Sequence, residues 1–280
     1  MSLNDVNTQP KTITVQILHP EILKDDYQTS LYQIILVREA ISVQIDFAEY
    51  TIPSHSILFL SPYQHLSSTT NMATTFTQLS FHGDYYCIEY HKKEVACNGI
   101  LFNNIYVQPY VTVSPVLFHE IATIYQKIQD EIPHHSDAII KAYLQLILAL
   151  CSKEKKRIMK DFVPLSLQDN TIGYQFQKDL EQFFRIQKTV LYYADRAGLS
   201  IDRFSKKIKQ QLGKSPSTLL QERTTLEAKK LLHLTYLSIK EIADELHFND
   251  EYYFSRYFKK NVGVSPSHYR EQVGISIVAK

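Results

Sequence analysis

Two sets of basic side chains near the C-terminus recur at helical spacing. Lys206 and Lys209 lie three residues apart in the first set, and Arg256 and Lys259 do the same in the second. A guanidinium can donate hydrogen bonds to both O6 and N7 of one guanine, whereas a lysine ammonium is better suited to phosphate oxygens. The spacing therefore predicts two helices whose exposed faces could hold the backbone and read the base edges of a nucleic acid.

Both sets belong to one pattern that occurs twice. The first copy begins at Ala194 and reads ADRAGLSIDRFSKKIKQQLGKSP, and the second begins at Ala243 and reads ADELHFNDEYYFSRYFKKNVGVSP. Each copy predicts a short helix, a tight turn and a second, amphipathic helix, at about 190–212 and 239–262. This order is typical of a helix-turn-helix motif, whose second helix enters the major groove of DNA.

The outward residues of the second helices are the candidate DNA contacts. Phe204 and Ile208 predict the inward face of the first copy, and Phe254 and Phe258 that of the second. The candidates on the remaining faces are Asp202, Arg203, Ser205, Lys206, Lys207, Lys209, Glu251, Tyr252, Ser255, Arg256, Lys259 and Lys260. We expect Arg256 to read bases and the lysines to hold phosphates.

Three of the aromatic and acidic side chains have an alternative interpretation. Glu251 could accept from cytosine or simply stabilise the dipole at its helix start. Tyr252 could equally contact DNA or pack in the core, and for Tyr253 packing is favoured.

The stretch between the copies predicts a helix of a length that suits DNA. Leucines recur with a helical period from Pro216 to His233, and Ser215 followed by Pro216 favours a helix start. About 18 residues at 1.5 Å each span roughly 27 Å, which is comparable with the ~34 Å of one turn of duplex. One chain could therefore place its two motifs in adjacent major grooves.

Charge is distributed unevenly along the 280 residues. Residues 174–280 contain 18 Lys and Arg against 12 Asp and Glu, whereas residues 1–173 contain 12 against 17. The asymmetry predicts a nucleic-acid module joined to a part that does not bind nucleic acid. Cys87, Cys97 and Cys151 show no CxxC spacing, and the first residues lack a signal-peptide pattern. We therefore expect reduced thiols in a cytoplasmic protein with no membrane partner.

The N-terminal residues predict strands followed by helices. Short segments rich in β-branched and aromatic residues predict a small β-barrel or sandwich, at 12–18, 32–37, 40–47, 55–60 and 74–81. The apolar period becomes helical from Ser114, which predicts one helix there and a second at about 136–156. The expected fold is therefore α+β, with a β-barrel and a helical segment before an all-α part that carries two helix-turn-helix motifs. The expected divisions are 1–113, 114–160, a linker at 161–171, and 172–272.

Residues 172–272 resemble the DNA-binding domain of the AraC/XylS family of bacterial transcription regulators. The run from Ser238 to Arg270, SIKEIADELHFNDEYYFSRYFKKNVGVSPSHYR, is similar to the family signature, and the first copy matches it more loosely. Asp202 stands where family members often carry a larger or basic side chain. His247 stands where many carry Gly, which predicts a strained turn at that residue.

The residues before this domain resemble, more faintly, the cupin-like sensor and helical dimerisation segment of the same family. The resemblance implies a regulator that binds promoter DNA as a duplex. It also implies contact with RNA polymerase, a small-molecule effector and a homodimer. It implies no cofactor and no catalytic residue.

Two other classes of function remain as alternatives. A cupin-type metal enzyme with a DNA-binding tail would need metal ligands, and His55, His65, His82 and His91 lie in the right region. Metal-binding cupins need two histidines two residues apart, and no such pair occurs in this region. We therefore expect no metal. The second alternative is an interaction protein whose basic domain binds an acidic partner.

Overall fold

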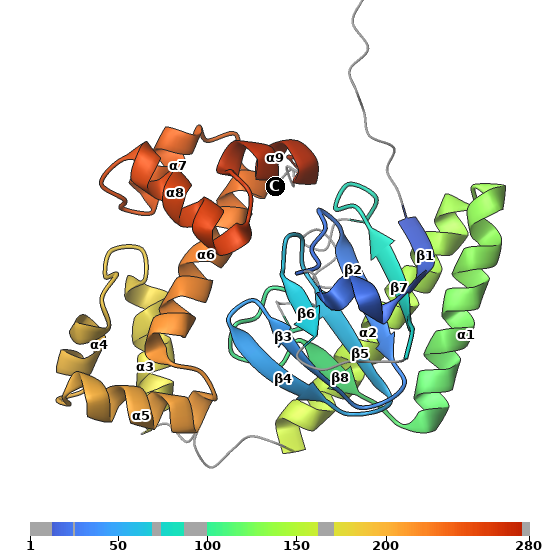
Figure 1. Ribbon diagram of the computed structural model, residues 1–280, viewed down its shortest axis with the longest axis horizontal. Helices are drawn as coiled ribbons and strands as arrows, with labels where there is room; N and C mark the ends of the chain where they lie inside the picture. Colours follow the sequence, from blue (N-terminus) through green and yellow to red (C-terminus); the bar gives the residue numbers. More distant parts are fainter. Residues whose placement is uncertain (1–12, 25, 69–73, 87–99, 162–170, 276–280) are drawn as a thin grey trace, which may run out of the picture.

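The computed structural model describes residues 13–24, 26–68, 74–86, 100–161 and 171–275. Figure 1 shows a strand-rich N-terminal part (residues 13–161) beside a helical C-terminal part (residues 171–275). Cys87, His91, Cys97 and most of the expected linker 161–171 lie outside the described residues.

The strands of the N-terminal part form two antiparallel sheets. The larger sheet has the order β1 (Ile13–Leu18), β7 (Phe76–Phe81), β2 (Tyr32–Val37), β5 (Ser56–Leu60) and β8 (Tyr110–Thr112). The smaller has the order β4 (Ala48–Ile52), β3 (Ile41–Ile45) and β6 (Leu66–Ser68). The expected α+β class is confirmed, but the strands form two open sheets rather than one closed barrel.

Strand β2 shows how the sequence creates two apolar layers. All six of its residues are buried, and successive side chains of a strand point to opposite faces. Ile34 and Leu36 pack in the core that includes α1 and α2, whereas Ile35 and Val37 pack in the core between the sheets. A strand buried on both faces carries a run of apolar residues, which here extends from Ile34 to Val37.

Two helices cover the outer face of the larger sheet (Figure 1). They are α1 (Pro115–Glu131) and α2 (Asp137–Asp161), joined by the short 3-10 turn η2 (Ile132–His134). Ser114 caps α1, because its hydroxyl accepts from the backbone N–H of Leu117 at 3.2 Å. The Tyr125 hydroxyl donates to the carbonyl of Ile34 at 2.8 Å, which fastens α1 to β2.

Seven helices follow in the C-terminal part, around a shared apolar core. They are α3 (Ile172–Phe183), α4 (Val190–Arg196), α5 (Ile201–Leu212), α6 (Pro216–Leu234), α7 (Ile239–Glu245), α8 (Glu251–Val262) and α9 (Pro266–Val273). In Figure 1, α6 runs between α3–α5 at one end and α7–α9 at the other. Within the described ranges, no helix is both long and apolar enough to cross a membrane.

Candidate nucleic-acid interface

The two repeats fold as helix, turn and helix, and each turn contains one residue in the left-handed region. Gly198 follows α4 with φ +65°, and His247 follows α7 with φ +53°. The strained turn predicted at His247 is therefore confirmed. Glycine adopts this conformation at no steric cost, whereas histidine is among the few other residues that tolerate it.

The starts of the second helices differ between the repeats. Asp250 caps α8, and its carboxylate accepts from the backbone N–H of Tyr253 at 2.6 Å. Ser200 is the N-cap of α5 with extended backbone angles but makes no side-chain cap hydrogen bond. The local sequence thus stabilises the start of α8 more strongly than the start of α5.

The predicted inward faces of α5 and α8 are confirmed. Phe204 and Ile208 are buried on α5, and Phe254 and Phe258 are buried on α8. Phe204 packs edge-on against the ring of Phe176 in α3, at a centroid distance of 5.3 Å. Burial of these faces fixes the rotation of each helix and therefore fixes which side chains point outward.

The twelve candidate contact residues share the remaining faces of these two helices. Ser205 and Ser255 are half-buried, and the other ten are exposed: Asp202, Arg203, Lys206, Lys207, Lys209, Glu251, Tyr252, Arg256, Lys259 and Lys260. The structure thus gathers each set on one helix, as the spacing predicts. Their roles in binding DNA remain predictions.

The aromatic residues at the start of α8 separate into two environments. The Tyr252 side chain is 77% exposed, so it does not pack in the core. The Tyr253 ring leans against Phe248 at a centroid distance of 5.9 Å and is half exposed. The Arg256 guanidinium carbon lies 6.0 Å from the centroid of the Tyr253 ring.

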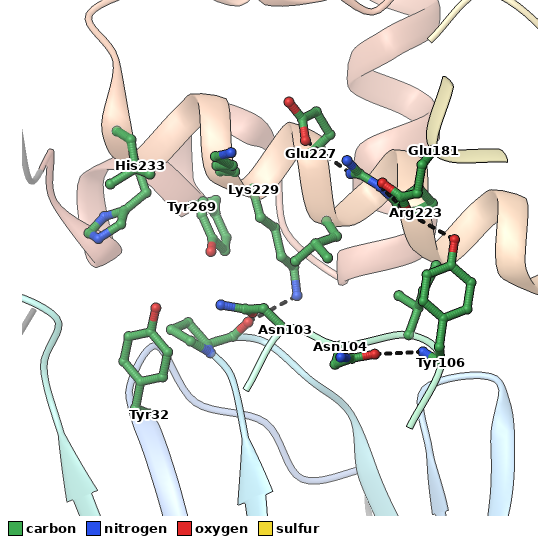
Figure 2. Close-up of a pocket in the computed structure, with 15 residues that line it drawn as sticks. Tyr32, Asn103, Asn104, Tyr106, Glu181, Arg223, Glu227, Lys229, His233 and Tyr269 are labelled. Atoms are coloured by element: carbon green, nitrogen blue, oxygen red, sulfur yellow. Dashed lines mark hydrogen bonds and ion pairs between the residues drawn. The ribbon is translucent and has the colours of Figure 1, made fainter. Parts of the chain in front are cut away.

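A cavity of about 270 Å³ lies where α6 faces the N-terminal part (Figure 2). Its polar and aromatic lining includes Tyr32, Asn103, Asn104, Tyr106, Glu181, Arg223, Glu227, Lys229, His233 and Tyr269. The Lys229 ammonium donates to the carbonyls of Pro62 at 2.9 Å and Tyr63 at 3.3 Å. Burial lowers the pKa of this ammonium to about 8.

The cavity residues were not among the sequence candidates. They come from segments that are far apart in the chain, so no spacing rule could connect them. One signal was present in the sequence: Arg223, Glu227 and Lys229 interrupt the apolar period of α6 with charge. Charged side chains on a helix that also packs internally often mark a polar contact rather than a solvated face.

The candidate metal histidines have separate environments. His55 stacks edge-on against Phe118, the His65 ring bonds Asp26 at 2.8 Å, and the His82 ring bonds the carbonyl of Gln272 at 2.9 Å. Within the ranges that the structure describes, no group of three or more His, Cys, Asp or Glu side chains could hold a metal ion.

Part of the C-terminal half resembles a known domain family. A family model described as a helix-turn-helix domain matches residues 193–272. The arabinose operon regulatory protein of Escherichia coli is 39% identical over 77 residues, which are 28% of this chain and 26% of that protein. The transcriptional regulator MtrA of Neisseria gonorrhoeae is 28% identical over 141 residues, which are 49% of this chain and 46% of that protein. The chain thus matches less than half the length of either relative.

Solved structures are similar to the chain over different shares of its length. The DNA-binding domain of AdpA, solved with a target DNA, is 24% identical, with coverage of 36% of this chain and 92% of that chain and a TM-score of 0.34. ToxT from Vibrio cholerae is 17% identical, with coverage of 94% of this chain and 99% of that chain and a TM-score of 0.40.

The matched residues 193–272 contain the second helix of each motif, α5 and α8, and both left-handed turns. Both of the relatives named above are regulatory proteins. Residues 193–272 thus form a helix-turn-helix domain similar to that of transcription regulators of the AraC/XylS family.

Proposed function

We propose that this protein is a sequence-specific transcription regulator that inserts α5 and α8 into adjacent major grooves of a promoter. The observation that carries the proposal is the pair of amphipathic helices held by one connector. Each helix buries an apolar face and exposes basic side chains. The connector α6 has 19 residues, or roughly 28 Å at 1.5 Å per residue, which is close to the ~34 Å of one duplex turn.

The two recognition helices would contribute differently. Arg256 on α8 is the proposed base reader, because its guanidinium can form two bonds to one guanine. The lysines at 206, 207 and 209 on α5, and at 259 and 260 on α8, would bind phosphates. Asp202, Arg203, Ser205, Glu251, Tyr252 and Ser255 complete the proposed contact surface.

The N-terminal part would sense a small-molecule effector in the cavity against α6. The support is chemical: the Lys229 ammonium has two neutral carbonyl acceptors, and the rings of Tyr32, Tyr106 and Tyr269 line the same space. An anionic group of the ligand would offset the charge of Lys229, and the rings would pack against an apolar part of the same ligand. A small organic anion is therefore the ligand class that we propose.

The remaining parts of the proposal concern assembly. Residues 1–113 would form the sensor, 114–160 a dimerisation segment, 161–171 a linker and 172–272 the DNA-binding domain. The exposed Ile139 and Leu146 on α2 support a homodimer through this helix. Once bound at a promoter in the cytoplasm, the protein would contact RNA polymerase.

The proposal is tested by selecting duplexes from a random library with the full chain. The dissociation constant is then measured for the selected duplex and for a shuffled sequence, at ~150 mM salt. We expect the selected duplex to bind at least about a thousandfold more tightly, as specific sites do. Equal affinity for both duplexes would rule out sequence-specific regulation and favour a basic domain for an acidic protein partner.

The effector proposal has its own test. Thermal unfolding of the full chain is followed with a panel of aliphatic and aromatic monocarboxylates. A binder should raise the midpoint for the wild type but not for Lys229→Met. An equal rise in both proteins would place the ligand elsewhere.

A further inference from the structure

One guanidinium joins the two helix-turn-helix motifs. Arg185 lies between α3 and α4, just before the first motif. Its Nη2 donates to the carboxylate of Glu227 on α6 at 2.5 Å, and its Nη1 donates to the carboxylate of Glu245. Glu245 is the last residue of α7, the first helix of the second motif. Arg185 therefore links the segment that leads into the first motif to the connector and to the second motif.

A second contact from the same segment reaches the second motif. The Lys188 ammonium lies 5.0 Å from the centroid of the Phe248 ring, in the turn between α7 and α8. The same ammonium donates to the carbonyl of Phe184 at 3.0 Å, which holds the segment 184–189 in a compact form. Two independent contacts thus connect this segment to the end of α7 and to the turn that follows it.

The carboxylate of Glu227 is a fixed anchor for this arrangement. Its side chain is only 5% exposed, and Arg223 donates to it at 2.9 Å. Burial opposes its ionisation, but the hydrogen bonds from Arg223 and Arg185 and the charges of Arg223 and Lys230 outweigh burial and hold the pKa of Glu227 below its ordinary value. Arg223 is held in turn by Glu181 on α3 at 2.9 Å and by the Phe184 ring, 3.9 Å from its guanidinium carbon.

We infer that Arg185 is a positioning residue that fixes the relative placement of α5 and α8 and so selects the number of base pairs between two half-sites. The inference rests on the proposed function. An inserted base pair moves the second half-site by about 3.4 Å and rotates it by about 34° around the duplex. Two motifs held by α6 alone could tilt toward the displaced site. Motifs that are also joined through Arg185 and Glu245 cannot follow it without breaking the ion pair.

The experiment compares DNA duplexes that differ only in the distance between half-sites. The probe is the duplex selected from a random library by the full chain, with one base pair inserted or deleted between its two half-sites. We expect the wild type to lose about tenfold in affinity for either variant, comparable with a lost base contact. Arg185→Gln and Glu245→Gln should lose only about threefold.

Glu241→Gln is the matched control. Glu241 is on the same helix as Glu245, but it closes the capping box with Ser238, a role that glutamine also fills. This variant should discriminate between spacings as the wild type does. Glu245 is exposed, with 46% of its side chain accessible, so its substitution tests the inference even if Arg185→Gln unfolds.

The outcomes distinguish a failure of the inference from a failure of the proposed function. If Glu245→Gln keeps the full spacing discrimination of the wild type, Arg185 is not a positioning residue. If the wild type binds its selected duplex but tolerates either spacing change, the inference also fails, while the proposed function stands. If the wild type selects no duplex, the proposed function and this inference fail together.

Discussion

The guanidinium of Arg256 lies 6.0 Å from the centroid of the Tyr253 ring, on the exposed side of α8. Such a contact contributes about 0.5–1 kcal/mol at an exposed site. The contact has a larger effect on orientation, because the ring restricts the long Arg256 side chain, which has no acidic ion-pair partner among the described residues. The contact holds the proposed base reader in place before DNA arrives.

Arg256→Ala should therefore relax sequence specificity as well as affinity. The expected cost is about 1–3 kcal/mol at one base position, because two hydrogen bonds to one guanine are lost. Dissociation constants for every single-base variant of the selected duplex would measure it. A uniform loss across all variants would contradict the assignment of Arg256 as a base reader.

Lys209→Ala should weaken binding to all duplexes alike. A phosphate contact releases counterions, so the slope of log affinity against log salt should fall in magnitude by about one. Titrations of the selected and shuffled duplexes at several salt concentrations supply both quantities. A change in base preference with an unchanged salt slope would reverse the roles given to Lys209 and Arg256.

The caps of the two recognition helices should differ in stability. Asp250→Ala should lower the free energy of unfolding by about 1 kcal/mol, because the N–H of Tyr253 loses its acceptor. Ser200→Ala should change it by less than about 0.5 kcal/mol, since Ser200 makes no side-chain cap hydrogen bond. Urea unfolding of the full chain measures both changes, and equal losses would show that the caps are equivalent.

The stability of the protein should rise with pH in a way that depends on Lys229. Burial lowers the pKa of Lys229 to about 8, below the usual value of about 10.4. Between these values the unfolded chain binds more protons than the folded chain, so the free energy of unfolding increases as pH rises. From pH 7.5 to pH 9.5 the wild type should gain about 1–2 kcal/mol relative to Lys229→Met.

Urea unfolding at the two pH values tests this expectation. Lys240→Met, at an exposed lysine on α7, is the control and should follow the wild type. If Lys229→Met gains as much stability as the wild type, the ammonium of Lys229 is not desolvated.

The C-terminal part could be predicted well because its structure is local. Phe204 and Ile208 lie one helical turn apart, so their spacing alone defines the buried face of α5. His247 occupies the position in the second repeat that Gly198 occupies in the first. Because few other residues tolerate positive φ, this alignment predicts a left-handed turn at both positions. In such a repeat, contacts between residues that are close in sequence determine most of the structure.

The sheets and the cavity depend on contacts that no local pattern contains. Strand β1 pairs with β7, so that Ile13 lies opposite Phe81, and spacing along the chain does not reveal such partners. Strand β4 is partly exposed and β8 has three residues, too few for a period to be recognised. The cavity beside Lys229 exists only because α6 meets the N-terminal part.

The most direct test of the account is methylation interference on the selected duplex with the full chain. We predict two clusters of guanines, about one helical turn or ~10 base pairs apart, at which major-groove methylation blocks binding. Both clusters should lie on the same side of the duplex. A single cluster, or interference confined to minor-groove positions, would contradict a protein that reads two adjacent major grooves with α5 and α8.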